Sequence, residues 1–336
     1  MQLAHTPERL AIPAGRTGAI IAALFAAMFG AAVLRLCLGA TFGLPDATLL
    51  TLRLSDVMAA GAAGFMLAVS GVGLQALLRN PLAEPYILGL SSGAALGVMV
   101  QAIIRLELGL AAGANHLGAI GGAMVTMAVV FLAGRRRGVI DPLGLLLTGV
   151  VLMTINGALV MLLNYWVGPG GIKENVSQWM MGYLTQSLSL TQIGFVGATG
   201  LVGLGILLAI APAMDVASFS DAEAISMGVN LRRLRTTLFV VSSVLAAGAV
   251  VLAGPIAFIG LVSPHIARLL LGPGHDTLLI ASALIGATLL ILANCASIAV
   301  NNAFETGILP IGAFAALLGG PVFLWMLRPH LGRGVS

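Results

Sequence analysis

Charged side chains are scarce in this sequence: Asp, Glu, Lys and Arg together make up 8% of its 336 residues. In a soluble globular domain such residues make up roughly a quarter of the chain. Hydrophobic residues account for 59% of the chain, and they occur in successive stretches near the roughly 20 residues that a membrane-spanning helix needs. The deficit of charge excludes a soluble fold and predicts an all-α, polytopic membrane protein.

Lysine is almost absent. The single lysine, Lys173, is followed by Glu174, whereas a Walker A phosphate-binding loop is Gly-rich and ends in Gly-Lys-Ser/Thr. We therefore expect the chain to lack an ATP-hydrolysing site and not to be an enzyme. Any process driven by ATP would need a separate subunit that binds this protein from the cytoplasm.

Cysteine is equally scarce. Cys37 and Cys295 stand in or near apolar stretches, without Cys-x-x-Cys spacing or a neighbouring His, so neither a disulfide framework nor a metal site is predicted. No group of His and acidic residues recurs at helical spacing, which disfavours a membrane-embedded enzyme. We expect no metal and no cofactor. The net charge of +4 is small and follows from membrane topology, so nucleic acid is not an expected partner.

The apolar stretches divide the chain into ten predicted crossings of the membrane. Residues 254–272 are too few for two full spans and contain Pro255 and Pro264, which interrupt helices. One crossing is therefore expected to be short or broken, and such backbone must be buried in protein or line a cavity. We treat residues 1–336 as one transmembrane domain. The predicted spans are 17–38, 57–78, 88–105, 116–134, 143–166, 192–213, 236–254, 263–272, 277–298 and 310–327.

The distribution of basic residues predicts how the helices are oriented, because cytoplasmic loops are enriched in Lys and Arg. With the N-terminus in the cytoplasm, only four of the 16 basic residues fall on the outer side. Both termini are therefore predicted to be cytoplasmic. The four outer residues are Arg35, Arg53, Arg105 and Lys173, and the inner ones are Arg9, Arg16, Arg79, Arg135, Arg136, Arg137, Arg232, Arg233, Arg235, Arg268, Arg328 and Arg333.

An ion-coupled transporter normally places acidic residues or His inside the membrane. With the predicted span limits, all 12 Asp and Glu residues map to loops or to the ends of spans. His265 could lie near the membrane in the short segment, but a lone His beside Pro264 is more often a structural residue. An ion-coupled secondary transporter is therefore the less favoured alternative.

Two predicted connections are longer than the others. The outer one, residues 167–191, contains Trp179 and Tyr183, which suit a membrane interface, and we expect a short interfacial helix there. In the inner one, residues 214–235, Ser220 is followed by acidic residues, which is the pattern of a short capped helix. The inner connection is therefore the largest polar surface predicted to face the cytoplasm.

A proline-containing segment follows the second predicted span. Pro81 and Pro85 are incompatible with a regular helix, and Asn80 can cap backbone groups. The chain then re-enters an apolar stretch through Ser91 and Ser92. Two interpretations stay open on these residues alone: a structured turn that gates a pathway at the mouth of a helix, or a tight connection between two helices.

Several segments resemble the FecCD family, the permeases of binding-protein-dependent ABC importers for iron-siderophore complexes, haem and cobalamin. The resemblance covers nearly the whole chain and is most specific over residues 80–94, Asn-Pro-Leu-Ala-Glu-Pro-x-x-Leu-Gly-x-Ser-x-Gly-Ala. Residues 178–182, 254–268, 309–312 and 319–325 are also similar. The resemblance implies ten helices per subunit, a second permease copy, two ATPase subunits below and a substrate-binding protein on the outer face.

The same resemblance implies roles for single residues. Gating positions of the family fall on the turn after the second span and on the start of the fifth span, and loop 214–235 corresponds to the coupling helices that seat in the ATPase. The family often has Arg-Leu-Pro-Arg where this chain has Arg-Leu-Ser-Asp, so one docking residue alone is carried over. The expected residues are Asn80, Pro81, Leu82, Leu147 and Thr148 for the gate, Asp221, Glu223, Gly228 and Arg232 for coupling to the ATPase, and Arg53 for docking of the binding protein.

The expected function is that of a non-enzymatic permease subunit in a bacterial inner membrane, which moves an iron-siderophore complex from the periplasm to the cytoplasm. Haem and cobalamin are alternative substrates, because the resemblance favours a siderophore only by how common it is in the family. A homodimer and a pair of related permease chains both stay open.

Overall fold

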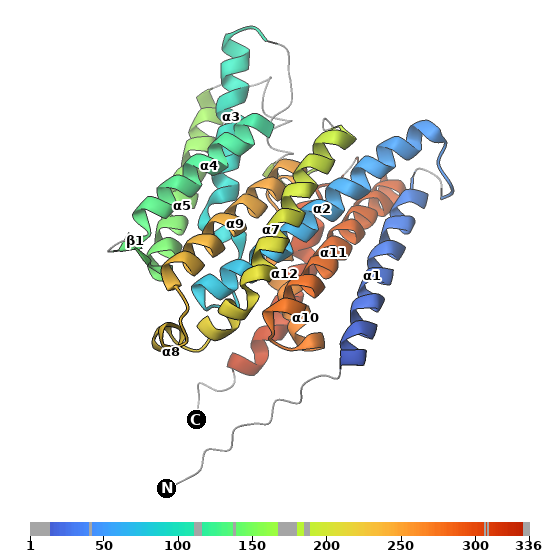
Figure 1. The fold of residues 1–336 in the computed structure, drawn as a ribbon. Helices are drawn as coiled ribbons and strands as arrows, with labels where there is room; N and C mark the ends of the chain where they lie inside the picture. Colours follow the sequence, from blue (N-terminus) through green and yellow to red (C-terminus); the bar gives the residue numbers. More distant parts are fainter. Residues whose placement is uncertain are drawn as a thin grey trace.

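Apolar helices make up nearly all of the structure, a computed structural model that describes residues 14–39, 42–110, 116–136, 139–166, 180–184, 189–305, 307 and 309–331 (Figure 1). Eight described helices are long and apolar enough to cross a membrane, and two shorter apolar helices join them, as the sequence predicts. These ten helices are α1 (Ala14–Cys37), α2 (Ala47–Leu78), α3 (Leu90–Glu107), α4 (His116–Ala133), α5 (Pro142–Trp166), α7 (Leu190–Ala217), α9 (Leu231–Ala253), α10 (Ile259–Leu271), α11 (His275–Phe304) and α12 (Ile311–Leu331).

Within the described residues, four short elements connect the long helices. A single 3-10 turn, η1 (Pro85–Leu88), stands between α2 and α3, and the predicted capped helix is present as α8 (Asp221–Ser226). The strands β1 (Arg135–Arg136) and β2 (Val139–Ile140) form a small antiparallel hairpin between α4 and α5. The interfacial helix predicted within residues 167–191 falls largely outside the described residues.

The second helix begins ten residues before its predicted start at residue 57, since α2 runs from Ala47. Asp46 caps it by accepting a hydrogen bond from the backbone N–H of Leu49. Arg53 and Asp56 resemble a polar break in the sequence, yet both lie inside the helix. Each has a polar partner outside it: Asp56 accepts from Arg35 of α1, and Arg53 donates to the carbonyl of Leu36. The prediction that every acidic residue lies in a loop or at a span end is therefore wrong for Asp56.

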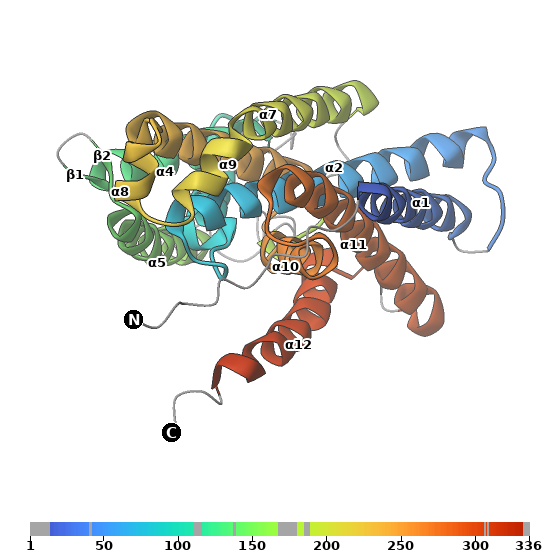
Figure 2. The same cartoon turned by 60° about the horizontal axis from the view of Figure 1, so that its bottom comes forward.

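The centre of the bundle consists of α2, α9 and α11, whereas α1 lies at its edge (Figures 1 and 2). Glycines allow the central helices to approach closely: a Cβ atom on Gly64 of α2 would overlap the carbonyl of Gly286 in α11. One on Gly71 would overlap the carbonyl of Gly260 in α10. Small residues at contacts are typical of membrane helices, which associate mainly through close packing.

The short predicted crossing is α10, which has 13 residues and contains Pro264. It begins at Ile259 rather than at 263, directly after Phe258, whose φ of 70° is left-handed. Seven residues of this helix, from Ile259 to Ala267, are buried. The interrupted helix is therefore enclosed by protein, as the bilayer requires of such backbone.

The described chain ends, the start of α1 and the end of α12, lie on the same side of the bundle as α8 (Figure 1). This arrangement agrees with a shared side for the ends and the inner connection. That this side faces the cytoplasm stays a prediction from the basic residues.

Candidate gate and coupling site

The end of α2 forms a compact turn, which we call the gate turn and define as residues 79–84. Arg79 ends the helix in a left-handed conformation, with φ 47° and ψ 38°. The Asn80 side chain accepts a hydrogen bond from Leu82 N–H at 2.9 Å, and its carbonyl accepts one from Ala83 N–H at 3.0 Å. Pro81 and Leu82 are exposed. The predicted gate residues thus form an ordered, protruding turn rather than an extended linker.

Buried polar contacts join the inner side of the gate turn to α10. The carboxylate of Glu84 accepts a hydrogen bond from the backbone N–H of Phe258. Gln75 donates to the carbonyls of Ala83 and Gly260, at 3.4 and 3.3 Å, and accepts from Arg268 at 2.7 Å. Burial raises the pKa of Glu84 to about 7, and the Phe258 N–H opposes that rise. Sequence reasoning did not single out Gln75, Glu84 or Arg268.

The two predicted gating segments meet through η1. A Cβ atom on Gly149 of α5 would lie 2.8 Å from the carbonyl oxygen of Ile87 and from the Cα of Leu88. The preceding residues of α5 are the predicted gate residues Leu147, which is 59% exposed, and Thr148, which is half-buried. The backbone after the gate turn therefore rests directly on the first turns of α5.

The predicted coupling residues lie on α8 and on the link to α9. Ser220 caps α8: its hydroxyl accepts from the backbone N–H of Glu223 at 3.1 Å and donates to the Glu223 carboxylate at 2.8 Å. Gly228 ends the turn after α8 with φ 81°, which favours glycine. Arg232 is exposed in the first turn of α9.

Apolar side chains also protrude around α8, a feature that sequence reasoning missed. Phe219, Ile225 and Met227 are 63%, 62% and 68% exposed. A helix of six residues is too short for hydrophobic periodicity to reveal its exposed side. The loop therefore offers apolar as well as charged groups to a partner.

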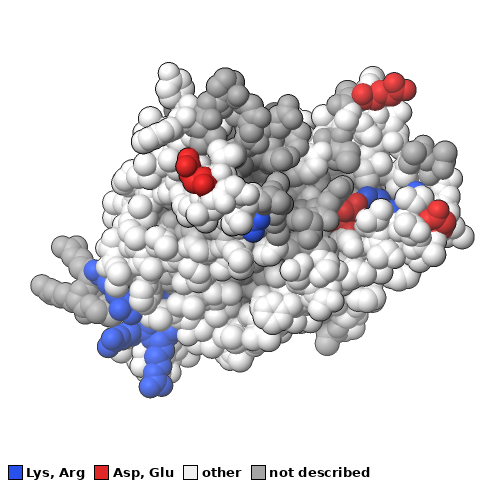
Figure 3. Space-filling view, turned by 90° about the horizontal axis from the view of Figure 1, so that it is seen from above, with Lys and Arg blue, Asp and Glu red and all other residues white. Residues whose placement is uncertain are grey.

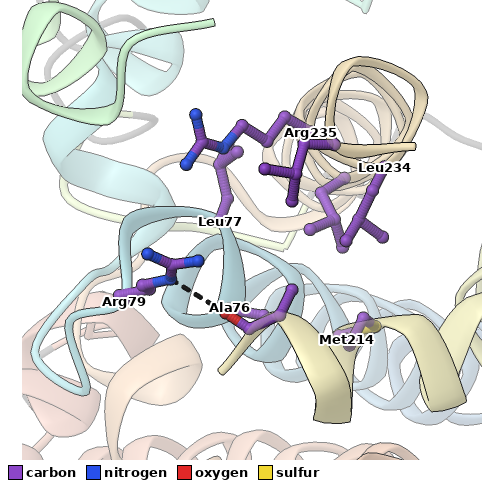
Figure 4. A pocket seen from close by; sticks show the side chains of 9 residues that line it. Ala76, Leu77, Arg79, Met214, Leu234 and Arg235 are labelled. Carbon is purple, nitrogen blue, oxygen red and sulfur yellow. Dashed lines mark hydrogen bonds between the residues drawn. The ribbon is translucent and has the colours of Figure 1, made fainter. Parts of the chain in front are cut away.

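Asp221 connects α8 to two other helices. Its Oδ1 lies 2.5 Å from Nη2 of Arg79, at the end of α2, and both of its oxygens lie 2.9 Å from Nη2 of Arg235 in α9. Arg79 also donates through Nε to the carbonyl of Ala217, the last residue of α7, at 2.9 Å (dashed in Figure 4). We call Arg79, Asp221 and Arg235 the inner charge cluster.

A cavity of about 10 Å³ lies beside the inner charge cluster, which is close to the volume that one water molecule needs. Arg79 and Arg235 line it together with apolar side chains such as Met214 and Leu234 (Figure 4). The junction of α2, α7 and α9 is therefore nearly closed at this point and leaves no room for a bulky ligand.

A second charge cluster lies in the first half of α2, on the far side from the gate turn. Arg35 of α1 donates to Asp56 at 2.5 Å and to the side chain of Asn294 in α11. Arg53, the predicted docking residue, donates to the carbonyls of Leu36 at 2.6 Å and Gly43 at 3.3 Å. Arg53 is thus half-buried against the α1–α2 connection, and its docking role stays a prediction.

Most of the face in Figure 3 carries no charge, and the largest group of Lys and Arg lies at its edge. Exposed arginines of β1 and of the first turn of α9 are Arg135, Arg232 and Arg233. Among the described residues, no group of three His, Cys, Asp or Glu side chains is placed to hold a metal ion.

The described chain thus combines ten apolar helices with an ordered turn at the end of α2 and a short exposed helix tied to that turn, which is the architecture of a polytopic membrane protein. The FecCD transport family matches residues 15–329, and the chain belongs to this family.

Curated relatives of several kinds are similar to this chain. The cobalamin import system permease protein BtuC of Halobacterium salinarum is 36% identical over 85% of this chain and 76% of its own length. The hemin transport system permease protein HmuU of Yersinia pestis is 36% identical over 83% and 82%. The Fe(3+) dicitrate transport system permease protein FecC of Escherichia coli is 32% identical over 86% of both chains.

A solved structure supports the fold. An inward-facing structure, proposed to be an ABC transporter of the metal-chelate type, superposes with a TM-score of 0.80 at 29% identity and covers 93% of this chain and 99% of its own. The fold is therefore that of an ABC transporter permease.

Proposed function

We propose that this chain is the permease subunit of a binding-protein-dependent ABC importer and that it moves an iron-siderophore complex from the periplasm to the cytoplasm. The observation that carries the proposal is the exposed, capped helix α8, which lies on the same side of the bundle as the described chain ends and offers apolar side chains to a partner. The names of the relatives, permease proteins for cobalamin, hemin and Fe(3+) dicitrate, support import of a bulky chelate.

The proposal places the chain in a bacterial inner membrane and requires three partners. An ATP-binding cassette subunit would bind α8 from the cytoplasm, where exposed Ile225 and Met227 offer apolar surface that is favourably buried in an interface. A substrate-binding protein would dock on the outer face near Arg53. A second permease copy, identical or related, would complete the pathway. The chain itself carries out no hydrolysis, and both of its termini lie in the cytoplasm.

One observation favours a second class of function. Asp56 lies inside an apolar helix, and acidic residues in that position often serve ion-coupled transport. Its pairing with Arg35 at 2.5 Å argues instead for a structural role, because the paired charges neutralise each other. An ion-coupled secondary transporter is therefore the weaker candidate.

The substrate class is tested by ATP hydrolysis in liposomes that contain the chain and its ATPase subunit. Binding protein is added empty or loaded with a ferric siderophore, haem or cobalamin. We expect the ferric siderophore complex to give the largest stimulation. Larger stimulation by haem or cobalamin would reassign the substrate, and no stimulation by any loaded binding protein would contradict the importer.

A further inference from the structure

We infer that Asp221 is the positioning residue that passes movement of α8 to the gate turn, through one carboxylate shared by Arg79 and Arg235. This inference rests on the proposed function, because only a permease driven from α8 has such a movement to transmit. It goes further by naming the contact that carries the movement and the contacts that do not.

The inner charge cluster joins elements that are far apart in the sequence. Asp221 is the first residue of α8, Arg79 is the residue that ends α2, and Arg235 lies in the second turn of α9. Arg235 also donates to the carbonyl of Ile140 in β2 at 3.3 Å. Figure 4 shows the Arg79 and Arg235 side chains extending from different helices beside the same small cavity. One carboxylate therefore meets two guanidinium groups at the junction of three helices.

The position of Arg79 gives the contact a direct route to the gate. Asn80 and Pro81 follow Arg79 immediately, and the left-handed backbone of Arg79 fixes the direction in which they leave α2. No flexible linker separates the charged group from the turn. A displacement of the Asp221 carboxylate therefore acts one residue away from Asn80.

The other contacts of the gate turn lead elsewhere. Gln75 and Glu84 connect it to α10 through buried hydrogen bonds, and Gly149 seats η1 on α5. The remaining bond of Arg79 goes to the carbonyl of Ala217 in α7. Among the described residues, the hydrogen-bonded contact that joins the gate turn to α8 is therefore that of Arg79 with Asp221.

Exposure makes the role of this contact testable by substitution. The side chains of Arg79 and Asp221 are 35% and 45% exposed, whereas that of Arg235 is 14% exposed. An exposed ion pair contributes little to stability, so removing the charge of Asp221 should leave the bundle folded. Arg235 holds the same carboxylate at 2.9 Å and keeps it near α9.

The test uses the complex of this chain with its ATPase and binding protein in proteoliposomes, where ATP hydrolysis and uptake are both measured. Asp221→Asn keeps the size of the side chain and removes its charge, and Asp221→Glu keeps the charge. Asp276→Asn is the matched control, because Asp276 is an exposed acidic residue in the first turn of α11, outside the gate and coupling sites.

We expect the Asp221→Asn chain to copurify with the ATPase and the complex to hydrolyse ATP. The amount of substrate transported per ATP should fall at least about 5-fold, which is the lower limit of typical coupling between sites. Asp221→Glu should restore the ratio, and Asp276→Asn should match the wild type. Unchanged transport per ATP in Asp221→Asn would overturn the inference, as would loss of ATPase binding, which would make Asp221 a docking residue. A wild-type complex without ATP-dependent uptake would instead overturn the proposed function.

A distance measurement gives a second, independent readout. Spin labels at Leu82→Cys and Ala222→Cys, with Cys37 and Cys295 replaced by alanine, report the separation of the gate turn from α8. We expect one distance that is kept with and without ATP when Asp221 is present, and a distance that changes with ATP in Asp221→Asn. Equal behaviour of the two proteins would contradict the inference.

Discussion

The two halves of α2 carry the same chemistry in different surroundings. In the first half Asp56 lies 2.5 Å from Arg35, and at the end of the second half Arg79 lies 2.5 Å from Asp221. The side chains of the first pair are 6% and 22% exposed, and those of the second are 35% and 45% exposed. Equal distances therefore hide unequal energies, because water and side-chain freedom weaken the exposed pair, whereas the buried pair cannot lose one partner without leaving a charge in an apolar interior.

The two pairs also differ in how firmly their partners are held in the bundle. Arg35 also holds Asn294 and the carbonyl of Leu38, so α1, α2 and α11 are fixed together. Arg79 and Asp221 join a long helix to a helix of six residues. We interpret the Arg35 pair as a fixed point of the bundle and the Arg79 pair as the point where movement enters.

The largest effect is expected from breaking the buried pair. Asp56→Ala leaves Arg35 without its carboxylate and should lower the free energy of unfolding by about 3–5 kcal/mol. Asp221→Ala, at the exposed end, should lower it by only about 0–1 kcal/mol. Thermal unfolding of the two variants in detergent checks the difference, and similar losses in both would remove the distinction between the two halves of α2. The double variant Arg35→Leu with Asp56→Leu should recover much of the loss, because no charge is left unpaired.

A smaller effect comes from Glu84, which joins the gate turn to α10. Its pKa of about 7 in the folded protein lies above the ordinary value of 4.5, so the folded state holds the proton more tightly than the unfolded state. The stabilisation is complete below pH 4.5 and is lost as the pH rises to about 7. At 1.36 kcal/mol per pKa unit the loss is on the order of 3 kcal/mol.

Glu84→Gln removes this titration, so its stability relative to the wild type should rise between pH 4.5 and 7. Unfolding midpoints of both proteins at several pH values measure the difference. A difference that does not vary with pH would show that Glu84 keeps an ordinary pKa. The Glu84 carboxylate would then be charged at neutral pH in both the folded and the unfolded protein.

Next in size is the contact between η1 and α5. Gly149→Ala places a methyl group 2.8 Å from the backbone of Ile87 and Leu88, and such overpacking should lower stability by about 1–3 kcal/mol and reduce uptake. Gly157→Ala in the same helix is the control, because a Cβ there meets no atom within 4 Å. Equal stability of the two variants would show that η1 is loosely seated and that the gate turn has no fixed support on α5.

The smallest effect on stability is expected at Arg232, an exposed residue of the predicted coupling surface. Arg232→Glu should change the free energy of unfolding by no more than about 0.5 kcal/mol. Its affinity for the ATPase should fall at low salt and approach that of the wild type at high salt, because exposed charges are screened. Equal affinity of both proteins at every salt concentration would remove Arg232 from the coupling surface.

Local signals predicted much of this fold. Apolar stretches located ten helices, Pro255 and Pro264 indicated the short one, and Ser220 with its acidic neighbours predicted α8. The start of α2 was missed because hydropathy treats Arg53 and Asp56 as solvated, whereas their partners lie in other parts of the chain.

The candidate site was predicted in part. The prolines predicted a turn at Asn80 to Leu82, and the resemblance alone gave it a gating role, which stays a prediction. The inner charge cluster was not predicted, because Arg79 and Asp221 are 142 positions apart. Nothing in a single sequence pairs two such residues. Gly149 was missed for the same reason, since its contact with η1 depends on how α5 packs.

The most direct test of the account measures uptake into proteoliposomes that contain this chain, with and without its ATPase subunit. Loaded binding protein is supplied outside, and either ATP or a proton or sodium gradient supplies the energy. We predict uptake only with the ATPase and hydrolysable ATP, and none with a gradient alone. Uptake by this chain alone, driven by an ion gradient, would contradict the account and make Asp56 the first residue to examine.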